Sequence, residues 1–189
     1  MTVQELFEGV RYQINDVDKV EYSDEELISY LNEAISFLNN LLIDNLSPLL
    51  IKTDELFLVQ GSSSLPEDFY LEKAVLDNQG NLLRSVSVGA PLTKDSYYIA
   101  GREIFSGNSR ITLYYYSVYP QISALTDTIQ VHPVFLNLLK QMVIFLALNR
   151  NEFNLSIEQA LMERFAQQAL SLSNKIGAAN IERQMPFVI

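Results

Sequence analysis

The stretch RITLYYYSVYPQISALTDTIQVHP, residues 110–133, contains the change of structure on which the fold depends. Its first part, residues 110–119, is rich in tyrosine and β-branched residues, which favour a β-strand. Pro120 ends that run, and small polar residues follow. Pro133 then precedes a strongly apolar run, and proline suits the first position of a helix because its missing N–H is not needed there. The stretch therefore predicts a strand that leads through a loop into a buried helix.

The residues after this stretch predict two helices. Residues 134–149 are apolar but are interrupted by Asn137, Lys140 and Gln141, so they indicate a buried helix rather than a membrane span. A last helix is predicted by residues that recur at helical spacing on one stripe: Ile157, Leu161, Phe165, Ala169, Leu172 and Ile176. The sequence Gly-Ala-Ala-Asn at residues 177–180 predicts the end of that helix.

The N-terminal side also predicts helices. Residues 3–12 carry a short apolar stripe, and residues 22–42, YSDEELISYLNEAISFLNNLL, contain the clearest helix start in the chain. Ser23 is placed to cap this second helix, and Glu26 is placed to reach back in a capping box. Pro48 prevents its continuation.

Between the two helical parts, residues 56–118 are predicted to be rich in β-strands. The expected strands are separated by turn signals at residues 78–81 and 106–109, and they comprise residues 71–76, 82–88, 96–100, 101–106 and 110–119. Residues 50–60 are ambiguous between strand and helix. Helices, then strands, then helices predict an α+β protein that is mainly α: a bundle of about four helices with a β-rich insertion between its N-terminal and C-terminal pairs. The expected parts of this single domain are residues 1–50, 51–125, 126–178 and an extended C-terminal arm, 179–189.

The residue types argue against catalysis. The chain has no cysteine, which excludes disulfides and thiolate chemistry, and His132 is the single histidine, which excludes a three-histidine metal site. His132 precedes Pro133 at a predicted helix start, where a capping or surface role is expected. No nucleophile, base and orienting group can be assembled from the remaining residues. We therefore expect no enzyme activity, no cofactor and no metal.

The net charge of −10 is unevenly distributed. Residues 1–60 contain twelve acidic side chains against three basic ones, whereas the remainder is almost balanced. One interpretation is that these acidic side chains keep the protein soluble. The other is that they form an acidic face on the N-terminal helices that repels phosphate. Under either one, tight binding to duplex DNA is disfavoured, because that affinity comes from neutralising phosphates.

Tyrosines and the apolar chain end are the candidate contact residues. Six tyrosines fall in the predicted strands or just after them: Tyr97, Tyr98, Tyr114, Tyr115, Tyr116 and Tyr119. Because side chains alternate along a strand, Tyr114 and Tyr116 should face opposite to Tyr115. Either one face of the sheet packs on the chain's own helices and the other is a partly hydrated surface, or the tyrosines form a subunit interface, where tyrosine is enriched. The same choice, between the chain's own core and a neighbour, applies to Met185, Phe187, Val188 and Ile189.

The ordered set of motifs resembles the head-to-tail adaptor (connector) proteins of tailed bacteriophages, especially short-tailed ones. The matching pieces are the Tyr-Ser-Asp helix start at residues 22–34, Leu-Pro-Glu-Asp-Phe at 65–69, the aromatic strand and proline at 111–120, and Asp-Thr-Ile-Gln-Val at 127–131. They lie in the family's order over about residues 20–170. The resemblance implies a structural virion protein, made in the host bacterial cytoplasm and located at the head-to-tail junction.

The resemblance further implies a ring, commonly twelve-fold, beneath the portal of the capsid. Such a ring extends the DNA channel, lets DNA pass without specific binding and presents a platform to tail or nozzle proteins, and its C-terminal arm engages the portal. On this view several acidic residues face the channel: Glu5, Glu8, Asp24, Glu25, Glu26 and Glu33. Two alternatives remain at this point, a cellular soluble oligomer that binds a ligand or partner, and another neck or tail-completion protein of a virion.

Overall fold

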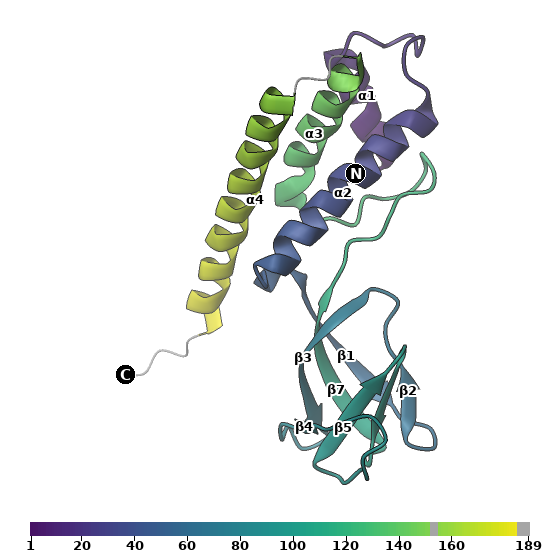
Figure 1. Cartoon of the computed structure of the whole chain (residues 1–189), viewed down its shortest axis with the longest axis vertical. Coiled ribbons are helices and arrows are strands. Elements are labelled where there is room, and N and C mark those ends of the chain that lie inside the picture. Colours follow the sequence, from purple (N-terminus) through teal and green to yellow (C-terminus); the bar gives the residue numbers. More distant parts are fainter. Residues whose placement is uncertain (152–154, 185–189) are drawn as a thin grey trace. The chain divides into compact units, whose positions relative to one another are not determined.

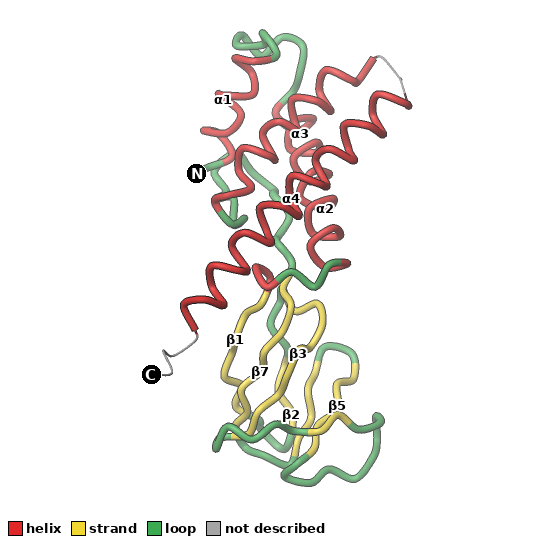
Figure 2. Tube along the Cα trace, turned by 90° about the vertical axis from the view of Figure 1, so that its left-hand side faces the viewer, coloured by secondary structure: helices red, strands yellow, loops and turns green. Residues whose placement is uncertain are grey.

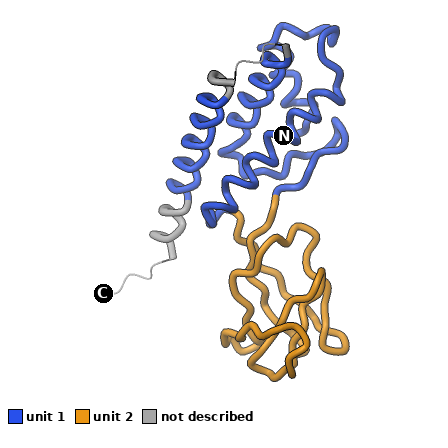
Figure 3. The backbone as a smooth tube through the Cα atoms, in the orientation of Figure 1, with its two compact units in different colours: residues 1–49, 119–189 blue, residues 50–118 orange. Residues whose placement is uncertain are grey.

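The chain divides into two compact units, and the sequence of one is inserted within the sequence of the other (Figure 3). One unit, which we call the helical unit, comprises residues 1–49 and 119–189, and the other, the β unit, comprises residues 50–118. The computed structural model describes residues 1–151 and 155–184, with side chains described for 1–150 and 159–176. The β unit is therefore inserted between two parts of the helical unit, and each unit has its own buried core.

The described residues of the helical unit form four α-helices, in agreement with the predicted bundle of about four (Figure 1). Their bounds are α1, Val3–Gln13; α2, Asp24–Asp44; α3, Leu136–Leu148; and α4, Leu155–Gln184, with 3₁₀ turns η1 at Pro48–Leu50, η2 at Pro133–Phe135 and η3 at Asn149–Asn151. Helix α3 contacts each of the other three helices, and α2 also contacts α4. Among the described residues, none of the helices combines the length and the apolar character needed to cross a membrane.

The helix starts follow from capping, with one difference from the prediction. Ser23 accepts a hydrogen bond from the amide of Glu26, as predicted for the start of α2. The Glu26 carboxylate does not reach back, however, because it accepts hydrogen bonds from Arg150 and from the hydroxyl of Tyr30. The complete capping box lies instead at α1, between Thr2 and Glu5.

Helix α4 is longer than the sequence predicts. The expected stop at residues 177–180 is wrong, since the helix continues through them to Gln184. A glycine inside a helix costs only about 1 kcal/mol relative to alanine, and Gly177 is followed by two alanines, the best helix formers. The predicted apolar stripe is confirmed where side chains are described, because Phe165 and Ala169 are buried. His132 acts as predicted at the other end of this helical pair: its ring nitrogen Nδ1 accepts the amide hydrogen of Val134 at the start of η2.

The β unit consists of two small sheets (Figure 2). The first has the strand order β1-β7-β3, all antiparallel, and the second has the order β2-β6-β5-β4. The strands are β1, Ile51–Phe57; β2, Ser62–Ser64; β3, Phe69–Asp77; β4, Arg84–Ser85; β5, Ser96–Ala100; β6, Glu103–Ser106; and β7, Arg110–Ser117. The ambiguous residues 50–60 thus provide a strand, because β1 finds a partner in β7 along its whole length.

Side chains from both sheets form the core of the β unit. Val75, Leu113 and Tyr115 from the first sheet meet Tyr97 and Ile104 from the second. The predicted strand at residues 82–88 is wrong in length: the regular strand there is β4 alone, and it lies parallel to β5. Leu82 and Leu83 instead pair with Leu76 and Val75 at the end of β3. The pairing with β3 stops there, so the two segments do not form a full hairpin.

Candidate functional site

The tyrosines of β7 lie on both faces of the first sheet. Tyr115 points into the core and is 1% exposed. Tyr114 and Tyr116 point to the opposite face and are half-buried. Tyr114 lies opposite Thr53 of β1 and Ala74 of β3. Tyr116 lies opposite Ile51 of β1 and Leu71 of β3. The alternation that the sequence predicts is therefore confirmed.

The face that carries Tyr114 and Tyr116 mixes apolar and polar side chains. We call it the outer sheet face: the register of the three strands gives it the apolar residues Ile51, Phe57, Leu71, Ala74, Leu76, Tyr114 and Tyr116, together with Thr53, Glu55, Arg110 and Thr112. Phe57 is 65% exposed and Leu71 40% exposed. The Arg110 guanidinium lies over the Phe57 ring, 5.5 Å from its centroid, and also pairs with Glu55. Exposed aromatic and aliphatic side chains on a rigid sheet are the composition that partner-binding surfaces favour.

The other candidate tyrosines lie elsewhere. Tyr97 is in the core of the β unit, like Tyr115, so these two rings are enclosed and do not present a surface to a partner. Tyr98 stacks on Phe105 with ring centroids 4.8 Å apart, on the second sheet. Tyr119 belongs to the helical unit. The structure therefore brings Tyr97 and Tyr115 together in the core and Tyr114 and Tyr116 together on the outer sheet face, and Met185, Phe187, Val188 and Ile189 lie outside the described residues.

The six acidic candidates separate into two groups. Asp24 pairs with Arg11 and Lys19, and Glu26 pairs with Arg150, so internal cations already neutralise these two carboxylates. The other four are exposed: Glu5, Glu8, Glu25 and Glu33. Glu5 accepts the backbone N–H of Thr2 in its capping box, whereas Glu25 and Glu33 form no ion pair among the residues described.

The Leu-Pro-Glu-Asp-Phe motif has a structural explanation that the sequence did not reveal. Its Asp68 accepts hydrogen bonds from the Tyr115 hydroxyl, at 3.0 Å, and from Lys52, while its backbone carbonyl accepts the amide of Val118. Phe69 packs on the Tyr115 ring, with centroids 5.7 Å apart. The motif therefore attaches the start of β3 to the tyrosine-bearing strand and fixes the position of β7.

The Tyr115 hydroxyl lies between two carboxylates, since Asp54 is also 3.0 Å away. Burial raises the pKa of Tyr115 above its usual value, and the hydrogen bonds to Asp54 and Asp68 raise it further. A tyrosine with a raised pKa stabilises the fold below its unfolded pKa, and this contribution is lost as the pH rises towards the folded value. No group of three or more metal-binding side chains is found among the described residues.

Replacing Tyr115 by phenylalanine is expected to lower the free energy of unfolding by roughly 1–2 kcal/mol, because both carboxylates then lose their shared donor. Urea unfolding followed by circular dichroism measures this loss. Tyr70→Phe is the matched control: Tyr70 is 53% exposed, so its hydroxyl is hydrated and its replacement should change stability by less than about 0.5 kcal/mol. Equal effects of the two substitutions would contradict the role given to the Tyr115 hydroxyl.

The segment after β7 is held by two asparagines of α2, which sequence reasoning missed. We call residues 119–122 the strap. Asn39 donates to the carbonyl and accepts from the amide of Tyr119, at 2.9 Å each, and Asn32 does the same with Ile122, at 2.9 and 2.7 Å. The signal was present as polar residues seven apart on an otherwise apolar helix face. These side chains replace the backbone partner that an extended segment would find in a sheet.

The Asp-Thr-Ile-Gln-Val motif fixes the rest of this connection to α1. The Asp127 carboxylate accepts the amides of Ser123 and Ala124, and these hydrogen bonds lower its pKa below the usual value. Its backbone carbonyl accepts the amide of Val3, and the amide of Ile129 donates to the carbonyl of Met1. The motif thus secures the first turn of the chain to the loop that precedes α3.

The remaining motif, Tyr-Ser-Asp at residues 22–24, joins three helices. The Tyr22 hydroxyl donates to the carbonyl of Ala147 near the end of α3, and Arg150 lies 5.0 Å from the Tyr22 ring centroid. Asp24 accepts from Arg11 of α1 at 2.7 Å. Each of the four motif pieces is therefore explained by contacts that stabilise the fold around it. The piece at residues 111–120 also carries Tyr114 and Tyr116 of the outer sheet face.

Comparison with known proteins assigns this framework to a family. A search of curated proteins returned no match. Residues 1–186 match the family described as SU10 adaptor protein. Because that match covers almost the whole chain and includes all of the motif pieces described above, the chain belongs to the SU10 adaptor protein family, a family of phage head-to-tail adaptors.

Proposed function

We propose that copies of this adaptor form a closed ring, commonly twelve-fold in such proteins, that binds the portal, extends the DNA channel and carries the tail or nozzle proteins. Family membership supports a structural virion protein at the head-to-tail junction, and the adaptor role implies assembly with portal and tail proteins. The observation that carries the ring proposal is the outer sheet face. Two of its apolar side chains, Phe57 at 65% and Leu71 at 40%, are exposed, and a neighbouring molecule in a ring would cover them.

The proposal assigns the outer sheet face to the contact between subunits. Leu71→Arg and Tyr116→Arg each place a charge in that contact, and we expect each to weaken assembly by at least tenfold. Light scattering after size-exclusion chromatography, with and without the portal protein, measures the assembled mass. Val20→Arg is the control, since Val20 is 82% exposed in the loop between α1 and α2, and thermal melts verify that each variant is folded.

Two outcomes would contradict different parts of the proposal. If both variants assemble like the wild type, the subunit contact does not lie on the outer sheet face, and the adaptor function is not contradicted. A wild-type protein that never associates with portal, or purified virions that lack the chain, would overturn the ring adaptor itself.

We also propose that the exposed acids Glu5, Glu8, Glu25 and Glu33 face the DNA channel. Like charges repel the phosphate backbone, so an acidic wall lets DNA slide without binding it. Asp24 and Glu26 contribute little to this field, because cations within the chain compensate them. A reconstruction of the virion should place the four exposed carboxylates on the channel wall, and one that places all of them on the outer rim would contradict this assignment.

A further inference from the structure

Strand β1 forms one edge of the first sheet, and a row of its backbone groups points away from that sheet (Figure 2). Its register with β7 is uninterrupted along the whole strand. The amide of Leu58 donates to the carbonyl of Ser109, and in an antiparallel pair the backbone groups that face the partner belong to every second residue. The N–H and C=O groups of Thr53, Glu55 and Phe57 are therefore directed to the free side of β1, where no described strand pairs with them.

The other free edges of the β unit are less open. Strand β3 has two shifts in its register, and near its end the carbonyl of Val75 accepts the amide of Leu83. Strands β2 and β4 contain three and two residues. Short strands, bulges and covering segments are features by which proteins prevent further strands from pairing with an edge. Among the described strands, β1 is therefore the one long and regular edge that remains free.

The charges of β1 do not close this edge either. Charged side chains on an edge strand discourage pairing when they are free to repel an incoming strand. In β1 each has a partner within the β unit, and the three pairs are Lys52 with Asp68, Asp54 with the Tyr115 hydroxyl, and Glu55 with Arg110. The strand also contains no proline. Its edge is therefore suited to an extended segment that brings backbone hydrogen bonds and no charge.

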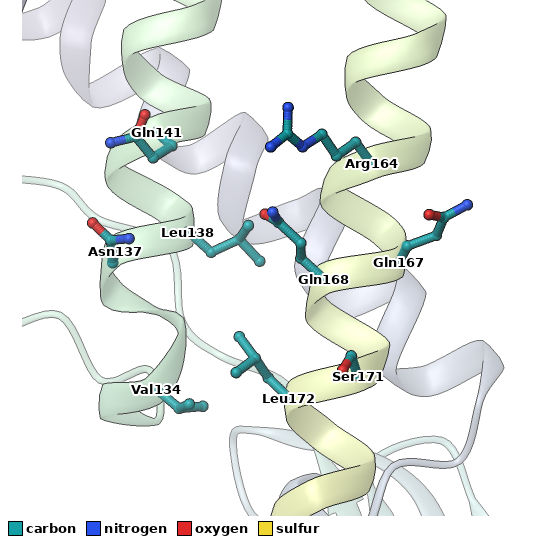
Figure 4. Close-up of a pocket in the computed structure, with 9 residues that line it drawn as sticks. All are labelled: Val134, Asn137, Leu138, Gln141, Arg164, Gln167, Gln168, Ser171 and Leu172. Atoms are coloured by element: carbon teal, nitrogen blue, oxygen red, sulfur yellow. The ribbon is translucent and has the colours of Figure 1, made fainter.

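The open groove between α3 and α4 has a different character (Figure 4). It has a volume of about 640 Å³, and six of its nine lining residues are polar. Exposed polar side chains are hydrated, so exchanging their water for a partner gains little free energy. The groove thus indicates no particular ligand. A strand edge does specify one, because an extended polypeptide supplies the alternating donors and acceptors that match it.

A second copy of this chain does not fit the β1 edge within a ring. Pairing β1 with β1 is isologous, which closes a dimer, whereas a ring needs two different surfaces on each subunit. The remaining described edges of a neighbouring copy are the short, irregular or covered ones. The matching strand is therefore expected from a different polypeptide.

We propose that the free edge of β1 binds an extended segment of a tail or nozzle protein, which adds to the first sheet as a further strand. The inference rests on the proposed function and specifies how the ring carries those proteins. The family resemblance implies that the C-terminal arm engages the portal, which leaves this edge for the tail side. Backbone hydrogen bonds from Thr53, Glu55 and Phe57 hold the segment, and the paired charges of β1 favour one that is uncharged and rich in β-branched residues.

Residue-resolved hydrogen exchange in the full-length chain tests the contact. In the assembly with portal alone, the amides of Thr53, Glu55 and Phe57 should exchange rapidly, whereas those of Asp54 and Leu56, which face β7, should be protected. Adding the purified tail or nozzle protein is expected to slow the first three amides by about tenfold or more. Burial by side chains alone would not protect every second amide. An edge that stays fast with the tail or nozzle protein bound, or that portal or neighbouring copies already protect, would overturn the proposal.

A proline at the centre of the edge provides the second readout. Thr53→Pro removes an outward N–H, and proline is accepted in edge strands where that N–H faces solvent, so the fold should be kept. We expect it to weaken binding of the tail or nozzle protein by about tenfold or more, because a carbonyl of the added strand is left unpaired in the contact. Thr53→Ala is the matched control, since it shortens the same side chain but keeps the N–H, and it should bind like the wild type.

Light scattering and thermal melts verify that both variants assemble and are folded. A folded Thr53→Pro protein that binds as tightly as Thr53→Ala would overturn the strand addition and leave the ring adaptor in place. If Thr53→Pro does not fold, the exchange measurement on the wild type decides alone. A wild-type ring that binds no tail or nozzle protein would instead overturn the proposed function.

Discussion

Replacing Asp16 by alanine is expected to lower the free energy of unfolding by roughly 3–5 kcal/mol, because it removes one partner of a buried ion pair. Asp16 is 2% exposed and Arg11 is 4% exposed. The Asp16 carboxylate accepts the backbone amides of Val20 and Glu21, at 2.8 and 2.9 Å, and a hydrogen bond from Arg11. The substitution would therefore leave Arg11 with less compensation and the loop before α2 without its acceptor.

The same carboxylate makes stability depend on pH. Burial by itself raises the pKa of Asp16, but the amides of Glu21, Val20 and Tyr22 and the charge of Arg11 outweigh it, so the pKa lies below the ordinary value. The pKa of Asp24 is also lowered, chiefly by its hydrogen bond from Arg11. A lowered folded-state pKa stabilises the protein above the unfolded value, near 3.8, and this stability is lost as the pH falls below it.

Urea unfolding at pH 7 and at pH 3 measures both effects. The wild type should lose stability between these values, and Asp16→Ala should show a smaller loss because one of the responsible carboxylates is already absent. Asp18→Ala is the matched control, since Asp18 is exposed in the same loop and should change stability by less than about 0.5 kcal/mol. Indistinguishable behaviour of the two alanine variants would show that the Arg11 cluster does not stabilise the fold.

Replacing Asn39 by leucine is expected to cost roughly 2–4 kcal/mol, although the two side chains have similar volume. Asn39 is 7% exposed and supplies both partners of the Tyr119 backbone. Leucine would leave an amide hydrogen and a carbonyl oxygen without a partner in a partly buried place, each at a cost of about 1–3 kcal/mol. The gain from one more apolar side chain is smaller than this sum because Asn39 already fills the space.

The neighbouring asparagine offers a matched control for this experiment. Asn40 is exposed on the same helix, so Asn40→Leu should change the midpoint of chemical unfolding very little. Hydrogen exchange adds a specific readout, since the amide of Tyr119 should lose protection in Asn39→Leu and keep it in Asn40→Leu. Retained protection in Asn39→Leu would mean that the strap does not depend on this side chain.

Much of the fold was accessible from local patterns. The capping serine of α2, the apolar stripe of α4 and the proline at residue 133 each act within a few residues of themselves, and the structure confirms them. The alternation of Tyr114, Tyr115 and Tyr116 is likewise a property of any strand. One error arose where a long-range contact outweighed a local signal. The Glu26 carboxylate binds Arg150, 124 residues away, instead of the backbone amide at the start of α2.

The sequence alone therefore determined the order and type of the elements, the α+β architecture and, through the ordered motifs, the adaptor family. Only the tertiary structure decided which tyrosines are enclosed and which acids are compensated, and that two asparagines hold a strap 80 to 90 residues further along the chain. The physical reason is that helix and strand signals come from interactions between near neighbours in sequence, whereas a buried polar group is satisfied by whatever the folded chain brings to it. That partner is set by the path of the backbone in space, which no local pattern encodes.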